Sequence, residues 1–522
     1  MDTLSFLNSA DPNAIEDIYR RFLADKNSVD ESWKIFFQGF AFAKRNYEDS
    51  DGIPERVRKE FNVINLINGY RSRGHLFTDT NPVRSRRNYS PTLAIENFGL
   101  VQSDLKETFH AGVQIGIGPA TLKDIVAHLE QTYCQSIGAE FMFIRDPQKL
   151  NWLLERMERS RNTPAFSTIE KKEIFEKLSQ AVLFENFLHT KFVGQKRFSL
   201  EGSETLIPAM HSIISHGAEL GIKDYVIGMA HRGRLNMLVN IMGKSYRDLF
   251  VEFEGAPTDD SLYDGDVKYH VGYSSDRTLT NGKKVHISLT ANPSHLEAVN
   301  PVVEGISRSK IDHVHNGNMQ AVCPILIHGD AAIAGQGIVY EVIQMMSLDG
   351  FKTGGTVHIV INNQVGFTTD YLDGRSSTYC TDVAKVVLSP VFHVNADDVE
   401  AVTFAVEMAL DYRQKFGRDV FIDLLGYRKY GHNEGDEPRF TQPLLYKQIA
   451  GHPNPRTIYA EQLKKELVLT DTEDTDSELQ FKELLQRELE LARTEGKPKI
   501  AAHLEGPWKG LRRSTSEDFL SS

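Results

Sequence analysis

Two polar loops, each following an apolar run, contain the residues with the clearest potential for chemistry. Residues 328–341 (HGDAAIAGQGIVYE) place Asp330 among very small side chains, and residues 356–367 (TVHIVINNQVGF) contain paired asparagines. Mg2+ prefers oxygen ligands, and it commonly takes one or two protein carboxylates together with phosphate oxygens and water. We therefore predict that Asp330, the side-chain carbonyl of Asn363 and the backbone carbonyl of Val365 share one Mg2+ ion, and that this ion carries a diphosphate.

The small residues around the acid favour the same interpretation. Gly329, Ala331 and Ala332 would let the backbone approach a bulky diphosphate. Gly335 and Gly337 suit a tight turn into a following helix, whose first N–H groups favour an anion. The alternative is that the acid caps a helix and that the asparagines are ordinary turn residues.

A sheet must position these loops. From about residue 165, short β-rich runs alternate with helical patterns, which indicates an α/β fold: a parallel sheet with helices on both faces. The predicted strands are residues 224–229, 285–290, 322–328, 357–362 and 419–425. Ligands of such sheets bind at the carboxyl ends of the strands. Polar segments follow all five strands, namely AHRGR, ANPSH, HGDAA, NNQVGF and GYRKYGHNEGDEP, so we expect them to converge.

The region before this domain is expected to be helical. Residues 1–44 form two predicted amphipathic helices, which start at Asp11-Pro12 and at Asp30. The second helix carries an aromatic stripe made of Trp33, Phe36, Phe37 and Phe40. This segment either folds back on its own chain or docks onto a partner protein.

The remaining domain boundaries follow from changes in the pattern of apolar and polar residues along the chain. Residues 45–163 are expected to form a small all-α domain without a visible active site, and residues 164–465 form the α/β domain. Residues 466–522 are expected to form a helical linker. Helices within the small domain are predicted at residues 57–71, 122–136 and 147–160.

Composition and charge exclude several classes of protein. Lys+Arg is 59 and Asp+Glu is 71, a net charge of −12, which argues against binding nucleic acid or anionic membranes. No apolar run is long enough to cross a membrane, and the first residues lack the pattern of a secretory signal. The three cysteines, Cys134, Cys323 and Cys380, are widely spaced, so we expect buried reduced thiols and neither a zinc site nor a disulfide framework.

Several long segments carry a resemblance to a known family. The Gly-Asp and Asn-Asn ends of the two loops are similar to the diphosphate motif of thiamine-diphosphate enzymes. The chain closely resembles the first, decarboxylating component of 2-oxoglutarate dehydrogenase complexes from its first helices to about residue 465. The segments are GMAHRGRLNML, VKYHVGYSSD, NPSHLEAVNPVVEG, HGDAAIAGQGIVYE, VINNQVGFTT, FHVNADDVEAV and YGHNEGDEP. The motif has Gly-Asp-Ala in place of the common Gly-Asp-Gly, as this branch of the family does.

The resemblance implies a transketolase-like domain that binds thiamine diphosphate and Mg2+. It implies that the metal is held by Asp330, Asn363 and Val365. It implies cofactor contacts from Arg232, Ser294, Leu296, Asp330, Ala331, Ala332, Asn363 and Val365. It also implies catalytic roles for His231, His270 and His432, with Arg232, His231 and His270 at the substrate. These residue types suit a dianion, because Arg and His form charge-assisted hydrogen bonds with carboxylates.

Other polar residues are less clear. His286, His358 and His393 lie within or beside apolar runs, and we expect them in the core or supporting the site. Three further residues stay open as candidates: His295, Tyr379 and Asp382.

The implied function is an oxidoreductase of the tricarboxylic acid cycle. The protein would decarboxylate 2-oxoglutarate and pass the succinyl group to a lipoyl group. Its partners would be the lipoyl-bearing succinyltransferase component and dihydrolipoyl dehydrogenase of the multienzyme complex, and the full-length protein would be a homodimer. The bacterial cytoplasm is the favoured location, and the mitochondrial matrix is the alternative.

The resemblance also implies that part of the site is supplied elsewhere. The domain that binds the aminopyrimidine and supplies its activating glutamate is expected after residue 522, so this chain alone should show little turnover. Three alternatives remain open: a related pyruvate dehydrogenase or transketolase, a non-catalytic docking protein, and a metal hydrolase. The segments AHRGR and KYH favour the 2-oxoglutarate branch.

Overall fold

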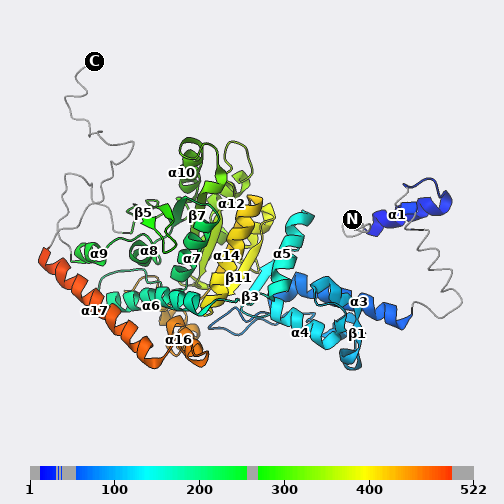
Figure 1. Cartoon of the computed structure of the whole chain (residues 1–522), viewed down its shortest axis with the longest axis horizontal. Helices are drawn as coiled ribbons and strands as arrows, with labels where there is room; N and C mark the ends of the chain where they lie inside the picture. Colours follow the sequence, from blue (N-terminus) through cyan, green and yellow to red (C-terminus); the bar gives the residue numbers. More distant parts are fainter. Residues whose placement is uncertain (1–11, 31–32, 35–36, 38–53, 255–268, 496–522) are drawn as a thin grey trace, which may run out of the picture.

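An eight-stranded sheet lies at the centre of the computed structural model, which describes residues 12–30, 33–34, 37, 54–254 and 269–495 (Figure 1). The strand order is β3-β11-β12-β8-β7-β4-β6-β5. The strands are β3 (Ile137–Glu140), β4 (Asp224–Met229), β5 (Tyr273–Thr278), β6 (Lys284–Leu289), β7 (Val322–Gly329), β8 (Val357–Asn362), β11 (Val391–Asn395) and β12 (Val420–Leu425). All five predicted strands are present.

The sheet is parallel except at its edges. Strands β6, β4, β7, β8, β12 and β11 pair in parallel, whereas β5 and β3 pair antiparallel with β6 and β11. The α/β fold class is thereby confirmed, although the sequence analysis did not predict β3, β5 and β11. The chain passes from β4 outward to β6 and then returns to β7 on the other side of β4. This reversal creates a switch point, where ligands of open α/β sheets bind.

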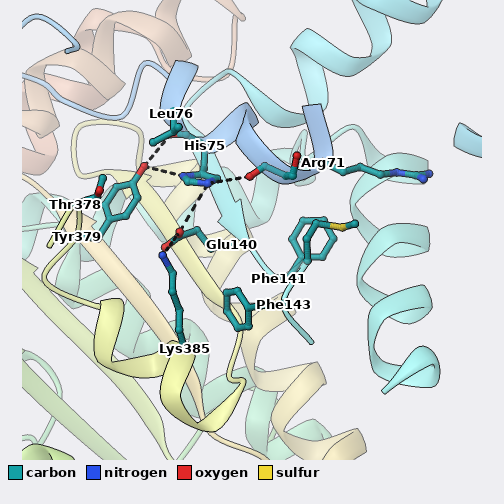
Figure 2. Close-up of a pocket in the computed structure, with 11 residues that line it drawn as sticks. Arg71, His75, Leu76, Glu140, Phe141, Phe143, Thr378, Tyr379 and Lys385 are labelled. Carbon is teal, nitrogen blue, oxygen red and sulfur yellow. Dashed lines mark hydrogen bonds and ion pairs between the residues drawn. The ribbon is translucent and has the colours of Figure 1, made fainter. Parts of the chain in front are cut away.

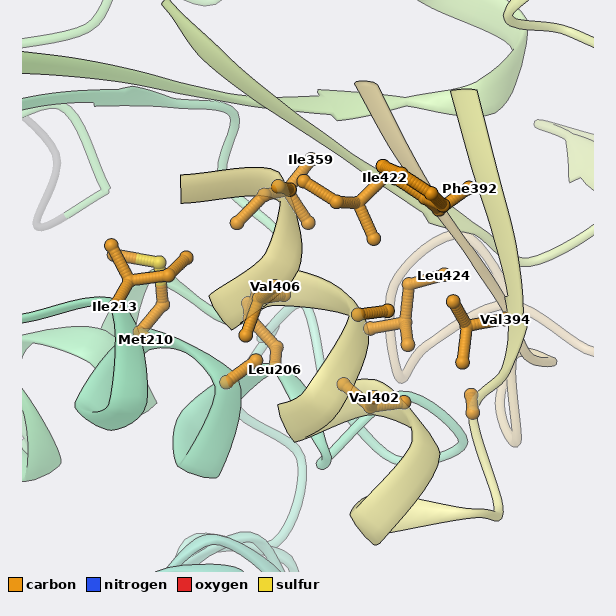
Figure 3. Close-up of a cluster of buried hydrophobic side chains, with 14 of the residues drawn as sticks. Leu206, Met210, Ile213, Ile359, Phe392, Val394, Val402, Val406, Ile422 and Leu424 are labelled. Carbon is orange, nitrogen blue, oxygen red and sulfur yellow. The ribbon is translucent and has the colours of Figure 1, made fainter. Parts of the chain in front are cut away.

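Helices cover both faces of the sheet, and the strands alternate between two cores. On one face, α7 and α14 pack against Ile359, Phe392 and Ile422 (Figure 3). On the other face, Val360 and Phe421 pack with residues of α11 and α12. The central strands are therefore apolar on both sides, as expected for a parallel sheet buried between helices.

The helices predicted at residues 57–71, 122–136 and 147–160 are present, and the first helix begins at Pro12, as predicted. The described helices are α1 (Pro12–Ala24), α3 (Glu55–Arg73), α4 (Leu122–Tyr133), α5 (Pro147–Ser160), α6 (Thr168–Lys191), α7 (Leu206–Glu219), α8 (Arg234–Asn240), α9 (Tyr246–Phe253), α10 (Asn300–His313), α11 (Asp330–Gly335), α12 (Gly337–Met345), α13 (Tyr371–Gly374), α14 (Val399–Phe416), α15 (Pro443–Ala450), α16 (Pro455–Lys465) and α17 (Asp471–Glu495). Local signals start several of them; for example, Ser167 and Glu170 form a capping box at α6.

The region that precedes the α/β domain is mainly helical but is joined to the sheet. Its strand β3 forms one edge of the sheet, and its buried side chains belong to the same hydrophobic cluster as the central strands. Two further two-stranded pairs are short: β1 (Thr108–Phe109) with β2 (Ala120–Thr121), and β9 (Val365–Gly366) with β10 (Thr369–Asp370). The boundary predicted at residue 163 stays a prediction.

The described part of the first helical segment has aromatic contacts within itself. The ring of Phe37 lies 5.0 Å from that of Tyr19, 5.3 Å from that of Phe22 and 5.3 Å from that of Trp33. The folding-back interpretation therefore has support for these residues. Phe36, Phe40, the boundary at residue 44 and the tail from residue 496 lie outside the described residues.

The three cysteines all lie among the described residues. Cys323 and Cys380 are buried and Cys134 is partly buried, and all three are free thiols. Among the described residues, no helix combines the length and apolar character that a membrane crossing needs.

Candidate functional site

Asp330 lies at the switch point, directly after β7. It is the first residue of α11, it is 3% exposed, and burial raises the pKa of its carboxyl to about 6. The nearest recorded cation is the Arg375 guanidinium, whose Nη1 lies 3.8 Å from Asp330 Oδ2. Helix α11 begins here after Gly329, so the alternative in which Asp330 is the N-cap residue is not what the structure has.

The paired asparagines end β8, the neighbouring strand, and enter a tight loop. The Oδ1 atom of Asn363 accepts a hydrogen bond from the Val365 N–H at 3.3 Å, which is a turn interaction. Gln364, between them, has a φ of +66°. Its Nε2 donates to Gly426 O at 2.8 Å, and this contact helps to hold the uncommon conformation.

The two loops touch each other. A Cβ atom added to Gly366 would lie 2.8 Å from the Cβ of Ala331, so only glycine allows this approach. Space remains on the other side of the first loop, because Cβ atoms added to Gly329, Gly335 or Gly337 would meet no atom within 4 Å.

Arg232 and two histidines line the neighbouring side of the site. Arg232 donates to Ser199 O at 2.9 Å and to His432 O at 2.8 Å. Burial, together with the nearby Arg428, lowers the pKa of Arg232 to about 10, while the charge of Asp330 opposes this shift. The rings of His231 and His432 lie 5.5 Å apart, and the ring of Phe198 lies 3.9 Å from that of His231.

Burial favours the neutral form of both rings. Burial lowers the pKa of His231 to about 3, and the charges of Arg232 and of the other histidines act in the same direction. Burial also lowers the pKa of His432, again with help from Arg232. A neutral imidazole can donate one hydrogen bond and accept another, which suits the recognition of a carboxylate beside a fixed cation.

The remaining predicted residues are Ser294 and Leu296, in the loop after β6, and His270, just before β5. The Nε2 atom of His270 is 2.8 Å from Ser294 Oγ, and His270 is close enough to His231 to influence its titration. Leu296 lies in the same loop, beside Glu297, whose Oε2 is 2.6 Å from His328 Nδ1. His328 comes two residues before Asp330, so this contact ties the loop to the end of β7.

The structure brings the predicted residues together and adds others that the sequence analysis missed. Arg375 faces Asp330, and Arg428 donates to Phe367 O at 2.9 Å. The ring of Phe367 in turn lies 5.0 Å from that of His432. Arg428 belongs to the segment GYRKYGHNEGDEP. Its sequence context does not mark it as a residue that could bind an anion, and only the fold, in which it follows β12, places it near Arg232.

The small helical region also supports the site, which its sequence did not suggest. Asn81 donates from Nδ2 to Gln364 Oε1 at 2.9 Å, and Arg84 Nη2 lies 2.5 Å from Asp370 Oδ2. Val83 packs against Val365 in a shared apolar cluster. Residues 81–84, from the region that precedes the α/β domain, therefore also hold the loop that carries the predicted metal ligands.

The polar residues whose role was unclear from the sequence lie in different parts of the fold. His358 and His393 are buried inside the sheet, as expected. The same expectation is wrong for His286, which is partly exposed on β6 and pairs with Asp276, because the neighbouring strand β5 is the polar edge of the sheet. Tyr379 lines a separate pocket, which is described below, and Asp382 accepts a hydrogen bond from the Tyr379 N–H at 3.1 Å. His295 is exposed in the loop after β6. Among the described residues, no group of three His, Cys, Asp or Glu side chains forms a metal-binding cluster.

Comparison with known proteins gives two family matches. The family model described as "Dehydrogenase E1 component" matches residues 176–501. The model described as "2-oxoglutarate dehydrogenase N-terminus" matches residues 4–44. The first match includes the loops that follow β4, β6, β7, β8 and β12 but not residues 81–84, and the second covers most of the first helical segment.

Similar proteins carry the name 2-oxoglutarate dehydrogenase E1 component. The one from Azotobacter vinelandii is 45% identical over 487 residues, covering 88% of this chain and 51% of that protein. Those from Cupriavidus necator and Haemophilus influenzae are 43% and 42% identical, covering 88% and 92% of this chain. The chain spans about half the length of the curated relatives that it matches.

The longer family match includes every strand of the parallel sheet from β4 to β12 and the loops that follow them. It accounts for more than half of the chain, and the relatives agree with it along most of the remaining length. On these grounds the chain belongs to the dehydrogenase E1 component family.

Proposed function

We propose that this chain forms the diphosphate- and metal-binding half of the active site of a thiamine-diphosphate-dependent 2-oxoglutarate dehydrogenase. The whole enzyme would decarboxylate 2-oxoglutarate oxidatively and transfer the succinyl group to a lipoyl group. The observation that carries the proposal is the buried carboxylate of Asp330 at the switch point of the sheet, in a loop that touches the loop of Asn363 and Val365 through Ala331 and Gly366.

The residues present fit a divalent cation bound to a diphosphate. A buried carboxylate with a raised pKa is stabilised by a nearby cation, and the Arg375 guanidinium lies 3.8 Å from Asp330, beyond hydrogen-bonding distance. Asn363 and Val365 would add two neutral oxygen atoms. Open space beside Gly329 and Gly337 leaves room for the diphosphate, and Arg232 would compensate its remaining negative charge.

When bound, thiamine diphosphate would supply the electron sink that decarboxylation of a 2-oxo acid requires. The chain's own residues would bind and orient the substrate. Arg232 is positively charged at neutral pH and is fixed by two carbonyl groups, so it can bind a carboxylate without losing much conformational entropy. His231 and His270, together with His432, would add hydrogen bonds from neutral or protonated rings.

Partners and location follow from the same proposal. We propose that the enzyme acts within a complex that contains a lipoyl-bearing succinyltransferase and dihydrolipoyl dehydrogenase, as a homodimer in the bacterial cytoplasm. The names of the bacterial relatives and the match of residues 4–44 support this assignment.

The decisive test is cofactor binding by the intact protein. Asp330→Ala should abolish the Mg2+-dependent binding of thiamine diphosphate, measured by calorimetric titration at several Mg2+ concentrations, because the only charged metal ligand is lost. Asp349→Ala is the matched control, since the Asp349 side chain is 96% exposed on the surface. Near-normal affinity in Asp330→Ala would show that the metal site is wrongly assigned.

A further inference from the structure

A line of buried polar side chains runs behind the loop that carries the predicted metal ligands. It begins at Asn362, the last residue of β8, which is 3% exposed. The Nδ2 atom of Asn362 donates to Asp423 Oδ1 at 2.9 Å, and its Oδ1 accepts from the Gln364 N–H at 3.2 Å. Asn362 thus fixes the start of the turn that presents Asn363 and Val365.

The next members of the line are an ion pair between neighbouring strands. Asp423 on β12 and His393 on β11 are register partners, each 1% exposed, and His393 Nδ1 lies 2.8 Å from Asp423 Oδ2. The other ring nitrogen of His393 lies 3.1 Å from Glu140 Oε2 on β3. Burial disfavours the charged ring, but the hydrogen bonds to the two carboxylates outweigh it and raise the pKa of His393 to about 9.

The outer end of the line reaches a pocket of about 330 Å³ (Figure 2). There Glu140 lies 2.6 Å from Lys385 Nζ and 3.7 Å from His75 Nε2. Tyr379 hydrogen-bonds His75 and stacks on His393, with ring centroids 3.8 Å apart. Charges therefore alternate along the line from Lys385 to Asp423, and each carboxylate has a partner.

We infer that Asp423 and His393 are positioning residues for the metal site: they hold Asn362, and through it the turn that carries Asn363 and Val365. Without an acceptor at Asp423, the amide of Asn362 would keep only its contacts with the Gln364 N–H and Cys380 Sγ among those of the described residues, and it would hold the positive-φ residue Gln364 less firmly. The inference rests on the proposed function, because it assigns a purpose to this turn. Partners that orient metal ligands commonly contribute about 10–100-fold to metal affinity.

An exchange of donor and acceptor tests this role. Asn362→Asp places a second carboxylate against Asp423, so the turn should be displaced. In the intact protein we expect the affinity for thiamine diphosphate at fixed Mg2+ to fall by about tenfold or more. The double variant Asn362→Asp/Asp423→Asn restores the hydrogen bond with reversed polarity, and its affinity should return to within about threefold of the wild type.

A control separates positioning from general destabilisation. Asp224→Asn removes a buried carboxylate of the same sheet, which pairs with Lys310 at 2.5 Å and His315 at 2.6 Å at the start of β4. It should lower the melting temperature without changing cofactor affinity. The inference is overturned if Asn362→Asp binds as the wild type does, if the double variant is no better than the single one, or if Asp224→Asn binds equally weakly.

The experiments give a different set of results if the proposed function is wrong than if only the positioning role is wrong. If the unmodified intact protein does not bind thiamine diphosphate in the presence of Mg2+, the proposed function is wrong. If it binds and Asp330→Ala does not, but Asn362→Asp binds normally, the function stands and only the positioning role is lost.

Discussion

At the scale of residues, Arg232 is unusual because its guanidinium lies near a second cation, Arg428, and burial lowers its pKa. It donates to two backbone carbonyls, and within the described ranges no carboxylate forms an ion pair with it. A buried guanidinium without an anion is costly, and here the cost shows as a lowered pKa. A bound anion would remove that cost, which explains why such an arginine would be kept beside an open site.

The first prediction concerns this charge. Arg232→Gln should lower kcat/KM for 2-oxoglutarate by about a hundredfold, since a hydrogen bond to a charged group is worth roughly 1.5–3 kcal/mol. The loss should be much smaller for pyruvate, which lacks the distal carboxylate. Steady-state kinetics of the intact enzyme with both substrates measures the difference.

Arg234→Gln is the matched control for Arg232→Gln. Arg234 is fully buried, whereas Arg232 is partly exposed, and Arg234 donates to Met229 O, Val271 O and Thr290 O. Its loss should lower the melting temperature and affect both substrates alike. Equal losses for both substrates in Arg232→Gln would mean that Arg232 supports the fold and does not recognise the distal carboxylate.

Individual site residues were predictable where they stand in a distinctive local context. Asp330 among small residues and Asn363 after an apolar run could be singled out, and the structure brings their loops into contact. Arg375 and Phe198 could not, because a lone arginine in a loop or a phenylalanine near a strand has no local signature. Their position depends on contacts between segments far apart in the chain.

At the scale of elements, the strands with continuous apolar runs were predicted and the others were missed. β3 has only four residues, IGAE, and β5 (YSSDRT) is polar and largely exposed at the edge. β11 (VFHVN) interrupts its apolar pattern with His393. Each of these strands forms because a neighbour supplies the pairing, and a pattern read along one segment contains no information about its neighbour.

The second prediction concerns the charged contact that joins β3, β11 and β12. The pKa of His393 is raised from 6.5 to about 9, so the folded state binds a proton more tightly than the unfolded chain. Its stabilisation is complete below about pH 6.5 and is lost as the pH rises to about 9. Glu140 has the opposite shift, to about 2, so its stabilisation is lost only as the pH falls below 4.5.

His393→Gln should therefore be less stable than the wild type at pH 6 and should lose less stability between pH 6.5 and 9. Thermal unfolding midpoints of both proteins across this range measure the effect. His286→Gln should keep the wild-type dependence, because His286 contacts an exposed aspartate at the sheet edge. A constant difference between wild type and His393→Gln at every pH would contradict the assignment of charge to His393.

At the scale of the whole molecule, helical segments precede and follow the sheet along the chain. The sheet and its helices contain the predicted metal site, and residues 81–84 brace the loop that carries it. Residues 4–44 match a separate family model, and that this segment is a distinct unit stays a prediction. Its ring contacts join Phe37 with Tyr19, Phe22 and Trp33, whereas the central hydrophobic cluster begins at Val63.

The last prediction follows from this separation. Removal of residues 1–44 from the intact protein should leave its melting temperature and its Mg2+-dependent cofactor affinity unchanged, because the described sheet and core are built from later residues. The truncated protein should nevertheless fail to assemble with the lipoyl-bearing succinyltransferase, as measured by sedimentation of the mixed components. Phe37→Ala is the finer variant, since Phe37 is 2% exposed and links the aromatic rings of the segment. If the truncated protein assembles normally but melts at a lower temperature, the segment stabilises its own chain and the docking role is wrong.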